Sequence, residues 1–206
     1  MPNLIDMTKP EAPATYCLMS VIAIISLAGI YKKGIFAALL LHPYSVVRQR
    51  QYYRLFTSDF VHNDFIHLIF NEISLYIFCA NLEVTLTKRV GNGSLNLLLI
   101  FVISELIANS LFTWRYRDNF DYSSAGCSGG VMGCLFAFMV LAPYGTAISF
   151  AFIGGVKNII TGIVYILLLV YYKWKKDNDM INHDIHFYGA IGGLLAVLIV
   201  DPSLLF

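Results

Sequence analysis

Long apolar segments alternate with short polar ones along most of the chain. A helix that spans a bilayer needs about 20 mostly apolar residues, with a range of roughly 17 to 25. By this criterion the pattern predicts six spans, of which the last two are short, as helices buried within a bundle can be. The predicted spans cover residues 12–31, 65–82, 95–114, 126–142, 158–172 and 185–200.

The region between the first two spans, residues 32–54, is mixed in character. A short apolar piece, residues 34–41, is followed by a His-Pro pair and then by basic residues. This piece is too short to cross a bilayer, so the sequence predicts a loop, called loop one below, that lies at the membrane interface. A further apolar run, residues 146–156, is separated from the fifth span only by Lys157 and is not assigned to a span.

The composition places these helices in a membrane. The sequence is 58% hydrophobic and 13% charged, whereas an ordinary soluble domain is roughly half apolar and about a quarter charged. We therefore expect an all-α membrane protein in which residues 1–206 form a single domain, a bundle of six transmembrane helices surrounded by the lipid bilayer. The net charge of +1 gives no electrostatic reason to expect a nucleic-acid partner.

The four cysteines all lie in apolar runs and lack the spacing of a metal or redox site. Buried thiols are the simplest interpretation of this pattern. We therefore expect neither a cofactor nor a metal ion to be bound through them.

Ser128 stands out among the polar residues of the predicted spans. It lies in the sequence Gly-Cys-Ser-Gly-Gly, which fits the G-x-S-x-G pattern of serine hydrolases, although the surrounding residues are apolar and predict no sheet. At the first turn of the fourth span, free backbone N–H groups and the helix dipole would favour a developing anion. A structural interpretation stays open, because the pairs Gly126/Gly130 and Gly129/Gly133 are spaced as in helices that approach closely.

His186 opens the sixth span in the sequence HFYGAIGG. Gly189 and Gly193, three and seven residues further on, lie on the same helix face as His186. If this face packs on the glycines of the fourth span, such as Gly129, the imidazole of His186 can reach Ser128. That geometry would allow a serine–histidine dyad with the imidazole as general base. The alternative is a histidine solvated near a helix end.

His67 and Asn71 lie on one face of the second span, because they are four residues apart. Both side chains can donate hydrogen bonds, and neutral donors in a dry site suit an oxyanion hole. The alternative is hydrogen bonding between helices. Two further ionisable residues of the spans, Glu72 and Glu105, receive no role from the sequence.

The candidate groups converge on one side of the membrane. Successive spans alternate in direction, so the second, fourth and sixth spans all begin on the same side. A nucleophile, a base and two hydrogen-bond donors are therefore predicted at one depth on three helices. Their coincidence is less expected by chance than any one of the patterns alone.

Other intramembrane chemistries lack their sequence patterns. The chain has no H-E-x-x-H sequence for zinc proteolysis, and residues 91–94 read Gly-Asn-Gly-Ser rather than G-x-G-D. His62, Asp64 and His67 are conceivable metal ligands. However, His62 and His67 would diverge if both lay on one helix, so we expect no metal site there.

Taken together, these motifs resemble the rhomboid family of intramembrane serine proteases, from about residue 53 to residue 201. His67 and Asn71 are similar to the family's H-x-x-x-N pair, Ser128 lies in a G-x-S-G motif, and His186 opens the H-x-x-G-x-x-x-G motif. Further points of similarity are Tyr53-Arg54 in place of a Trp-Arg pair, His62, and the Glu83 and Gly91 of the loop after the second span.

The resemblance implies a six-helix rhomboid core that hydrolyses transmembrane protein substrates near the membrane surface. It implies that Ser128 is the nucleophile and His186 the base, without a third carboxylate, and that His67 and Asn71 bind the oxyanion. Structural support for this site is expected from Gly126, Gly129, Gly189, Gly193 and Arg54. The chain is similar to a small bacterial member of the family, so we expect a multi-pass protein of the bacterial cytoplasmic membrane.

Two other functions fit parts of the pattern. A catalytically inactive rhomboid-like protein that binds membrane clients would keep the fold, but such relatives usually lack the serine or the histidine. A small transporter or channel would need a repeat or a charged pathway, and the sequence has neither. The natural substrate, the cleavage sequence and the oligomeric state do not follow from the sequence.

Two features depart from the family pattern. Met132 stands where an aromatic residue usually packs against the base, so His186 would be held less firmly. Ten of the 14 lysines and arginines fall on the side of the predicted site, which by the positive-inside rule would face the cytoplasm. Family members of this type generally face outward. We follow the family pattern, because loop one is long and partly interfacial, and its positive charges are therefore a poor guide to the orientation.

Overall fold

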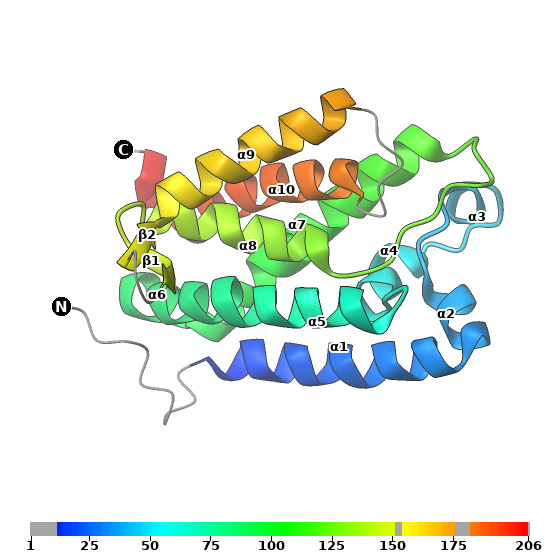
Figure 1. Ribbon diagram of the computed structural model, residues 1–206, viewed down its shortest axis with the longest axis horizontal. Coiled ribbons are helices and arrows are strands. Elements are labelled where there is room, and N and C mark those ends of the chain that lie inside the picture. Colours follow the sequence, from blue (N-terminus) through cyan, green and yellow to red (C-terminus); the bar gives the residue numbers. More distant parts are fainter. Residues whose placement is uncertain (1–11, 151–153, 176–181, 206) are drawn as a thin grey trace.

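The computed structural model describes residues 12–150, 154–175 and 182–205, and within them the chain forms a bundle of helices (Figure 1). A π-helical turn, η2 (Leu75–Cys79), joins α5 and α6 into one continuous helical segment. The helices of the bundle are α1 (Pro13–Tyr31), α5 (Phe65–Ser74), α6 (Ala80–Val90), α7 (Gly93–Tyr116), α8 (Ser128–Leu141), α9 (Asn158–Lys175) and α10 (His183–Val200).

Four helical segments of the described chain are long and apolar enough to cross a membrane. These segments are Pro13–Tyr31, Phe65–Val90, Gly93–Tyr116 and His183–Val200. Two shorter apolar helices, Ser128–Leu141 and Asn158–Tyr171, complete the apolar part of the bundle. Each region that the sequence predicts as a span is therefore helical, and the protein is an integral multi-pass membrane protein.

The second helical segment is longer than the predicted span over residues 65–82, because it continues as α6 to Val90. The added turns are polar, and two of their charged groups, Glu83 and Arg89, have partners in the structure. Arg89, for example, pairs with Asp201 at the end of α10. Hydropathy marks where the apolar surface ends, whereas the helix continues for as long as its backbone hydrogen bonds do.

A β-hairpin adds a feature that the all-α expectation does not include. The apolar run at residues 146–156 contributes to β1 (Thr146–Phe150) and β2 (Gly154–Lys157), which pair in antiparallel orientation. The hairpin connects α8 to α9 directly. Asn158, at the start of α9, is buried and donates its side-chain amide to the Ala142 carbonyl oxygen at 2.8 Å. This contact fixes the base of the hairpin to the end of α8.

Loop one folds into short helices that gather at one end of the bundle (Figure 1). Arg54 is buried there, and its guanidinium donates to the carbonyl oxygens of Ala37 at 3.0 Å and Leu40 at 2.7 Å. It also donates to the side chain of Gln51 at 2.6 Å. Arg54 therefore fastens the first half of the loop to the second. In the structure loop one continues beyond residue 54 to the start of α5, and its elements are α2 (Lys33–Leu39), α3 (Pro43–Arg48), α4 (Arg54–Thr57) and η1 (Ser58–Phe60).

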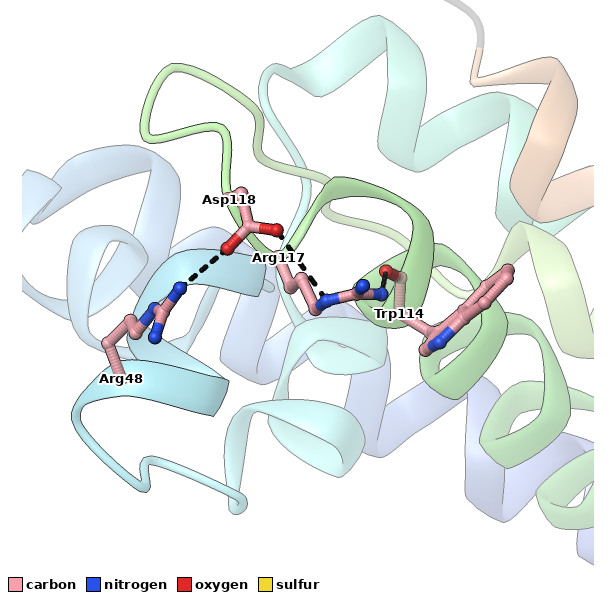
Figure 2. A network of polar contacts seen from close by, with 4 residues as sticks. All are labelled: Arg48, Trp114, Arg117 and Asp118. Carbon is pink, nitrogen blue, oxygen red and sulfur yellow. Dashed lines mark hydrogen bonds and ion pairs between the residues drawn. The ribbon is translucent and has the colours of Figure 1, made fainter.

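Loop one is also joined to the connection between α7 and α8. Leu41 and Ser124 exchange two backbone hydrogen bonds, of 2.8 and 2.9 Å. Figure 2 shows a second link, in which Arg48 of α3 pairs with Asp118 at 2.7 Å, while Arg117 contacts Asp118 from the other side. These ion pairs are exposed and contribute little to stability. The backbone pair is therefore the firmer attachment.

The centre of the bundle is formed by α7, α8 and α10, and α8 and α10 meet backbone against backbone. A Cβ atom added to Gly189 would overlap the carbonyl oxygen of Gly129, and one added to Gly193 would overlap that of Gly133. The two helices can adopt this spacing only because these positions lack side chains. The predicted contact between the two glycine faces is therefore present.

Glu83 anchors the opposite end of the bundle. Its side chain is fully buried, and one carboxylate oxygen accepts from the N–H and hydroxyl of Thr15 at 2.9 and 2.7 Å. The other accepts from the Ala14 N–H at 3.0 Å and the Ser94 hydroxyl at 2.6 Å. The first N–H groups of a helix have no partner within it. Glu83 therefore caps α1 and fixes it to the start of α7.

We expect Glu83→Ala to lower the free energy of unfolding by at least about 2 kcal/mol, because several buried donors would lose a charged acceptor. Thermal unfolding of the purified protein in detergent measures the change. Thr85→Ala is the matched control, because the Thr85 hydroxyl bonds to the Asn81 carbonyl oxygen of its own helix, and it should cost less than about 1 kcal/mol. Equal effects in the two variants would contradict the capping role of Glu83.

Candidate active site

The starts of α5, α8 and α10 lie at the end of the bundle where loop one gathers (Figure 1). The β-hairpin and the C-terminal turn η3 (Pro202–Leu205) lie at the other end. This arrangement agrees with the alternating directions that the sequence predicts. The candidate residues carried by the three helix starts are therefore on one side of the protein.

Ser128 is the first residue of α8 and is half-buried. The chain reaches it through Gly126, whose φ of +110° lies in the region that favours glycine. The Gly126 N–H donates to the carbonyl oxygen of Ser58 at 2.9 Å. A Cβ atom on Gly126 would lie 2.9 Å from the His67 ring. The chain segment that leads to Ser128 thus passes between η1 and α5, where only glycine fits.

His186 lies in the first turn of α10 and is half-buried. The Asn182 side chain caps this helix by accepting from the Ile185 N–H at 3.3 Å. Gly189, one turn after His186, lies against Gly129, the neighbour of Ser128. A close backbone contact between α8 and α10 therefore lies near both residues. Among the described residues, however, no hydrogen bond joins Ser128 to His186.

Tyr165 is a partner of His186 that the sequence analysis missed. Its hydroxyl lies 3.1 Å from Nδ1 of His186, and it reaches the ring from α9. In the sequence Tyr165 counts only as one more residue of an apolar span, and its hydroxyl within that span is the signal that could have marked it. Met132, the residue in place of the expected aromatic, is buried in the hydrophobic core. The observed contact with the ring of His186 thus comes from α9 and not from α8.

His67 and Asn71 both reach the segment that leads into α8. The His67 ring faces Gly126, and the Asn71 side-chain oxygen accepts from the Cys127 thiol at 3.5 Å. Asn71 is buried and donates one N–H to the His67 carbonyl oxygen at 3.0 Å. Asp64 caps α5 by accepting from the His67 N–H at 2.8 Å. The predicted pair therefore lies beside the residues that precede Ser128.

The position of His62 differs from the one that the sequence predicts. His62 does not diverge from His67, because α5 begins only at Phe65, and the two rings lie edge to face with centroids 4.8 Å apart. Ser26 donates its one hydroxyl hydrogen to the Phe60 carbonyl oxygen at 2.9 Å. It must therefore accept from Nδ1–H of His62, which lies 2.7 Å away. His62 is thus a neutral donor that connects α1 to the site.

Two acidic residues of the predicted spans, Glu105 and Glu72, lie close to the candidate residues in the structure. In the part of the chain that the structure describes, no group of three or more His, Cys, Asp or Glu side chains is arranged to hold a metal ion. Glu105 lies behind α8, where one of its carboxyl oxygens accepts from the Gly130 N–H at 2.6 Å. Glu72 on α5 has a buried oxygen without a hydrogen-bond partner.

Comparison with known proteins gives consistent matches. The Rhomboid domain family matches residues 49–203. The chain is 30% identical over 154 residues to "Putative rhomboid protease YdcA" of Bacillus subtilis (strain 168), which covers 72% of this chain and 67% of that protein. It is 30% identical over 155 residues to "Rhomboid protease GluP" of the same organism, covering 74% of this chain but 27% of GluP.

A plant protein matches more weakly. "Rhomboid-like protein 15" of Arabidopsis thaliana is 23% identical over 149 residues, which cover 68% of this chain and 36% of that protein. The matched region therefore spans well under half the length of the plant protein and of GluP.

The fold and the site define a class of protein: a multi-pass membrane bundle with a serine, two histidines and an asparagine gathered where three helices begin. The family match covers most of the chain, and the match to YdcA over 67% of that protein agrees with it. The chain belongs to the rhomboid family.

The environment of His62 makes stability depend on pH. Burial lowers the pKa of His62 to about 3, whereas a histidine in an unfolded chain titrates near 6.5. Between these values the unfolded state binds more protons, so the free energy of unfolding falls as the pH is lowered. We expect His62 to contribute a loss on the order of 1 kcal/mol per pH unit below about pH 6.

Thermal unfolding at pH 7 and pH 5, for wild type and His62→Gln, measures this contribution. A glutamine can still donate to Ser26 but does not titrate in this range. Its unfolding temperature should therefore fall less than that of the wild type between the two pH values. The same decline in both proteins would show that His62 is not the group responsible.

Proposed function

We propose that the protein is an intramembrane serine endopeptidase that cleaves transmembrane protein substrates, with Ser128 as nucleophile and His186 as general base. The observation that carries the proposal is the backbone contact of Gly129 with Gly189, which lie one residue after Ser128 and one helical turn after His186. Membership of the rhomboid family supports it. So do the names of two relatives, which call those proteins rhomboid proteases.

In the proposed reaction, Ser128 Oγ attacks the carbonyl carbon of the scissile peptide bond while Nε2 of His186 takes the hydroxyl proton. The tetrahedral intermediate collapses as the imidazolium gives this proton to the leaving nitrogen and the C–N bond breaks. Water then attacks the acyl-enzyme, with His186 again taking a proton. The acid product leaves, and Ser128 regains its hydrogen.

The negative charge of each intermediate needs hydrogen-bond donors. In our proposal these are the backbone N–H of Ser128 at the start of α8 and the side chains of His67 and Asn71. The contacts of His67 with Gly126 and of Asn71 with Cys127 support this assignment, because they keep both side chains beside the approach to the serine. A donor of this kind typically contributes about 10²–10³ in kcat.

Tyr165 takes the place of a third catalytic group as a positioning residue. For Nε2 to act as a base, the hydrogen of the neutral ring must lie on Nδ1. The Tyr165 oxygen, 3.1 Å away, can accept that hydrogen and so hold the ring in the required tautomer. It would also stabilise the imidazolium, although less than a carboxylate would.

The architecture of the proposed enzyme is a single rhomboid domain over residues 1–206 with six spans and an interfacial loop one. The two short spans would be α8 and α9, and not the fifth and sixth spans that the sequence predicts as short, because α10 is long enough to cross a membrane. Nearly all residues of α8 are buried by neighbouring helices, so it does not have to match the full bilayer thickness. Exposed aromatic residues of loop one, such as Tyr52, Tyr53 and Phe56, suit a membrane interface. Substrates would approach the serine between loop one and the nearby end of α9.

A non-catalytic rhomboid-like protein that binds membrane clients is the alternative. The lack of a hydrogen bond between Ser128 and His186 in the described structure is the observation in its favour. Hydrogen bonds of a catalytic pair are often long before substrate binds, so this observation weighs less than the presence of both residues. Reactivity of the serine distinguishes the two functions.

We expect a fluorophosphonate probe to label the wild-type protein and to label neither Ser128→Ala nor His186→Ala. Cleavage of a transmembrane test substrate should be lost in the same two variants, because the nucleophile or its base is missing. Ser123→Ala is the control, since this exposed serine lies outside the site, and it should behave as wild type. Wild-type protein that neither reacts with the probe nor cleaves any substrate would favour the non-catalytic alternative.

We expect Tyr165→Phe to lower kcat roughly tenfold with little change in KM, because the ring of His186 would lose one hydrogen bond that matters during proton transfer. Kinetics in detergent or in liposomes measure both constants. Tyr144→Phe serves as the control, because Tyr144 is exposed beside the hairpin. Unchanged kcat in Tyr165→Phe would exclude a positioning role for this hydroxyl.

A further inference from the structure

Glu105 supplies a hydrogen bond that α8 cannot make for itself. It lies in α7 with 2% of its surface exposed, and its Oε1 accepts from the Gly130 N–H at 2.6 Å. Gly130 is the third residue of α8, so this N–H has no partner within the helix. Cys127, the residue before the helix, provides no side-chain cap. Glu105 therefore caps α8 from a neighbouring helix, two residues after Ser128.

The glycines that follow the serine make room for this carboxyl group. A Cβ atom on Gly129 would lie 2.9 Å from Glu105 Oε2, and one on Gly130 would lie 2.9 Å from Glu105 Cγ. Both distances are too short for real side chains. Because residues 129 and 130 are glycines, the carboxyl group of Glu105 can lie against one side of α8. Gly129 also lets α10 pack closely on another side.

A second carboxyl group faces the first. Asp59 of η1 is buried, and its Oδ1 accepts from the Asn109 amide at 2.9 Å and the Ser58 hydroxyl at 3.3 Å. Asn109 also donates to the Leu55 carbonyl oxygen at 3.0 Å. Asn109 lies one turn after Glu105 on the same face of α7, so its bond to Asp59 places the carboxyl groups of Asp59 and Glu105 next to each other. The pair connects loop one, α7 and the start of α8.

Such a pair requires a proton. Glu105 Oε2 is buried and has no donor among the described residues, and the ion pairs of that part of the chain involve other acids. The titratable groups that face the pair are Cys79 and Cys127, and neither is a cation. Two adjacent carboxylates without a cation repel strongly in a medium of low dielectric constant. Burial accordingly raises the pKa of Asp59 from 3.8 to about 7.

We propose that Glu105 is a neutral carboxylic acid that positions the first turn of α8, and Ser128 with it. Oε1 accepts the Gly130 N–H, and Oε2 donates its hydrogen to Asp59. This assignment explains why Oε2 has no donor: it is itself the donor. Asp59 is left to accept from Glu105, Asn109 and Ser58.

The neutral state of Glu105 matters for the chemistry, and this part of the inference rests on the proposed function. The free N–H groups and the helix dipole at the start of α8 favour an oxyanion near Ser128. A carboxylate hydrogen-bonded to the same turn would offset that effect. Loss of the Glu105 proton at high pH therefore lowers kcat.

Two substitutions separate a neutral acid from a carboxylate. Glu105→Gln keeps an oxygen that accepts from Gly130 and gains N–H groups that can donate to Asp59, but it does not titrate. We expect it to retain kcat within a few-fold of wild type. Glu105→Leu leaves the Gly130 N–H and Asp59 without partners, and we expect a roughly 10- to 100-fold lower kcat with little change in KM.

The pH profile of kcat provides the decisive readout. Wild-type kcat should decline at alkaline pH, and Glu105→Gln should lack that decline. Glu72→Gln is the matched control, because Glu72 also has a buried, unpartnered oxygen, and it should keep the wild-type profile. The inference is overturned if Glu105→Gln is as inactive as Glu105→Leu, if it declines as wild type does, or if Glu72→Gln abolishes the decline.

A measurement that needs no activity separates this inference from the proposed function. The wild-type infrared spectrum at neutral pH should contain a protonated carboxyl band that is missing from Glu105→Gln, and thermal unfolding should rank Glu105→Gln above Glu105→Leu. Both results are expected even if no Ser128-dependent labelling occurs, in which case only the proposed function fails. Identical infrared bands in wild type and Glu105→Gln would overturn the neutral state of Glu105.

Discussion

Gly189 and Gly193 of α10 lie directly against the backbone of α8, and the positions of the other candidate groups follow from this contact. Two helices that pack through their side chains have axes about 8–10 Å apart. A serine on one helix would then be held further from a histidine on the other. Removing the side chains at the contact lets the helix starts converge. The same absence of side chains admits Glu105 beside Gly129. One spacing requirement therefore serves packing, the proposed dyad and the cap of α8.

Within a bilayer, every backbone group needs a partner in the protein, because water is absent. The bundle meets this need by capping helices from their neighbours. Glu83 caps α1, Glu105 caps α8, and Arg54 satisfies carbonyl oxygens of loop one. Each of these bonds joins elements that are distant in sequence. Polar residues that hydropathy treats as exceptions therefore hold the bundle together, and two of the three do so near the candidate site.

The groups around the serine share a further property, since hydrogen bonds rather than charges hold them. His62 is neutral and donates to Ser26, and Tyr165 bonds His186 through a hydroxyl. Asp59 and Glu105 are arranged to share a proton rather than to carry two charges. An environment of this kind does not compete with a transient oxyanion, whose stabilisation comes from fixed dipoles. The proposed reaction and the proposed role of Glu105 therefore require the same electrostatic setting.

The sequence by itself determined the helical class, the approximate spans and the glycine faces, because apolar length and helical spacing are local properties. The spacing of His67 with Asn71, and of His186 with Gly189, likewise indicated which residues share a helix face. Only the tertiary structure decided which side chains from different helices meet. The bond of Tyr165 to His186, the bond of His62 to Ser26 and the pairing of Asp59 with Glu105 depend on how elements far apart in sequence pack, and no local pattern encodes those distances.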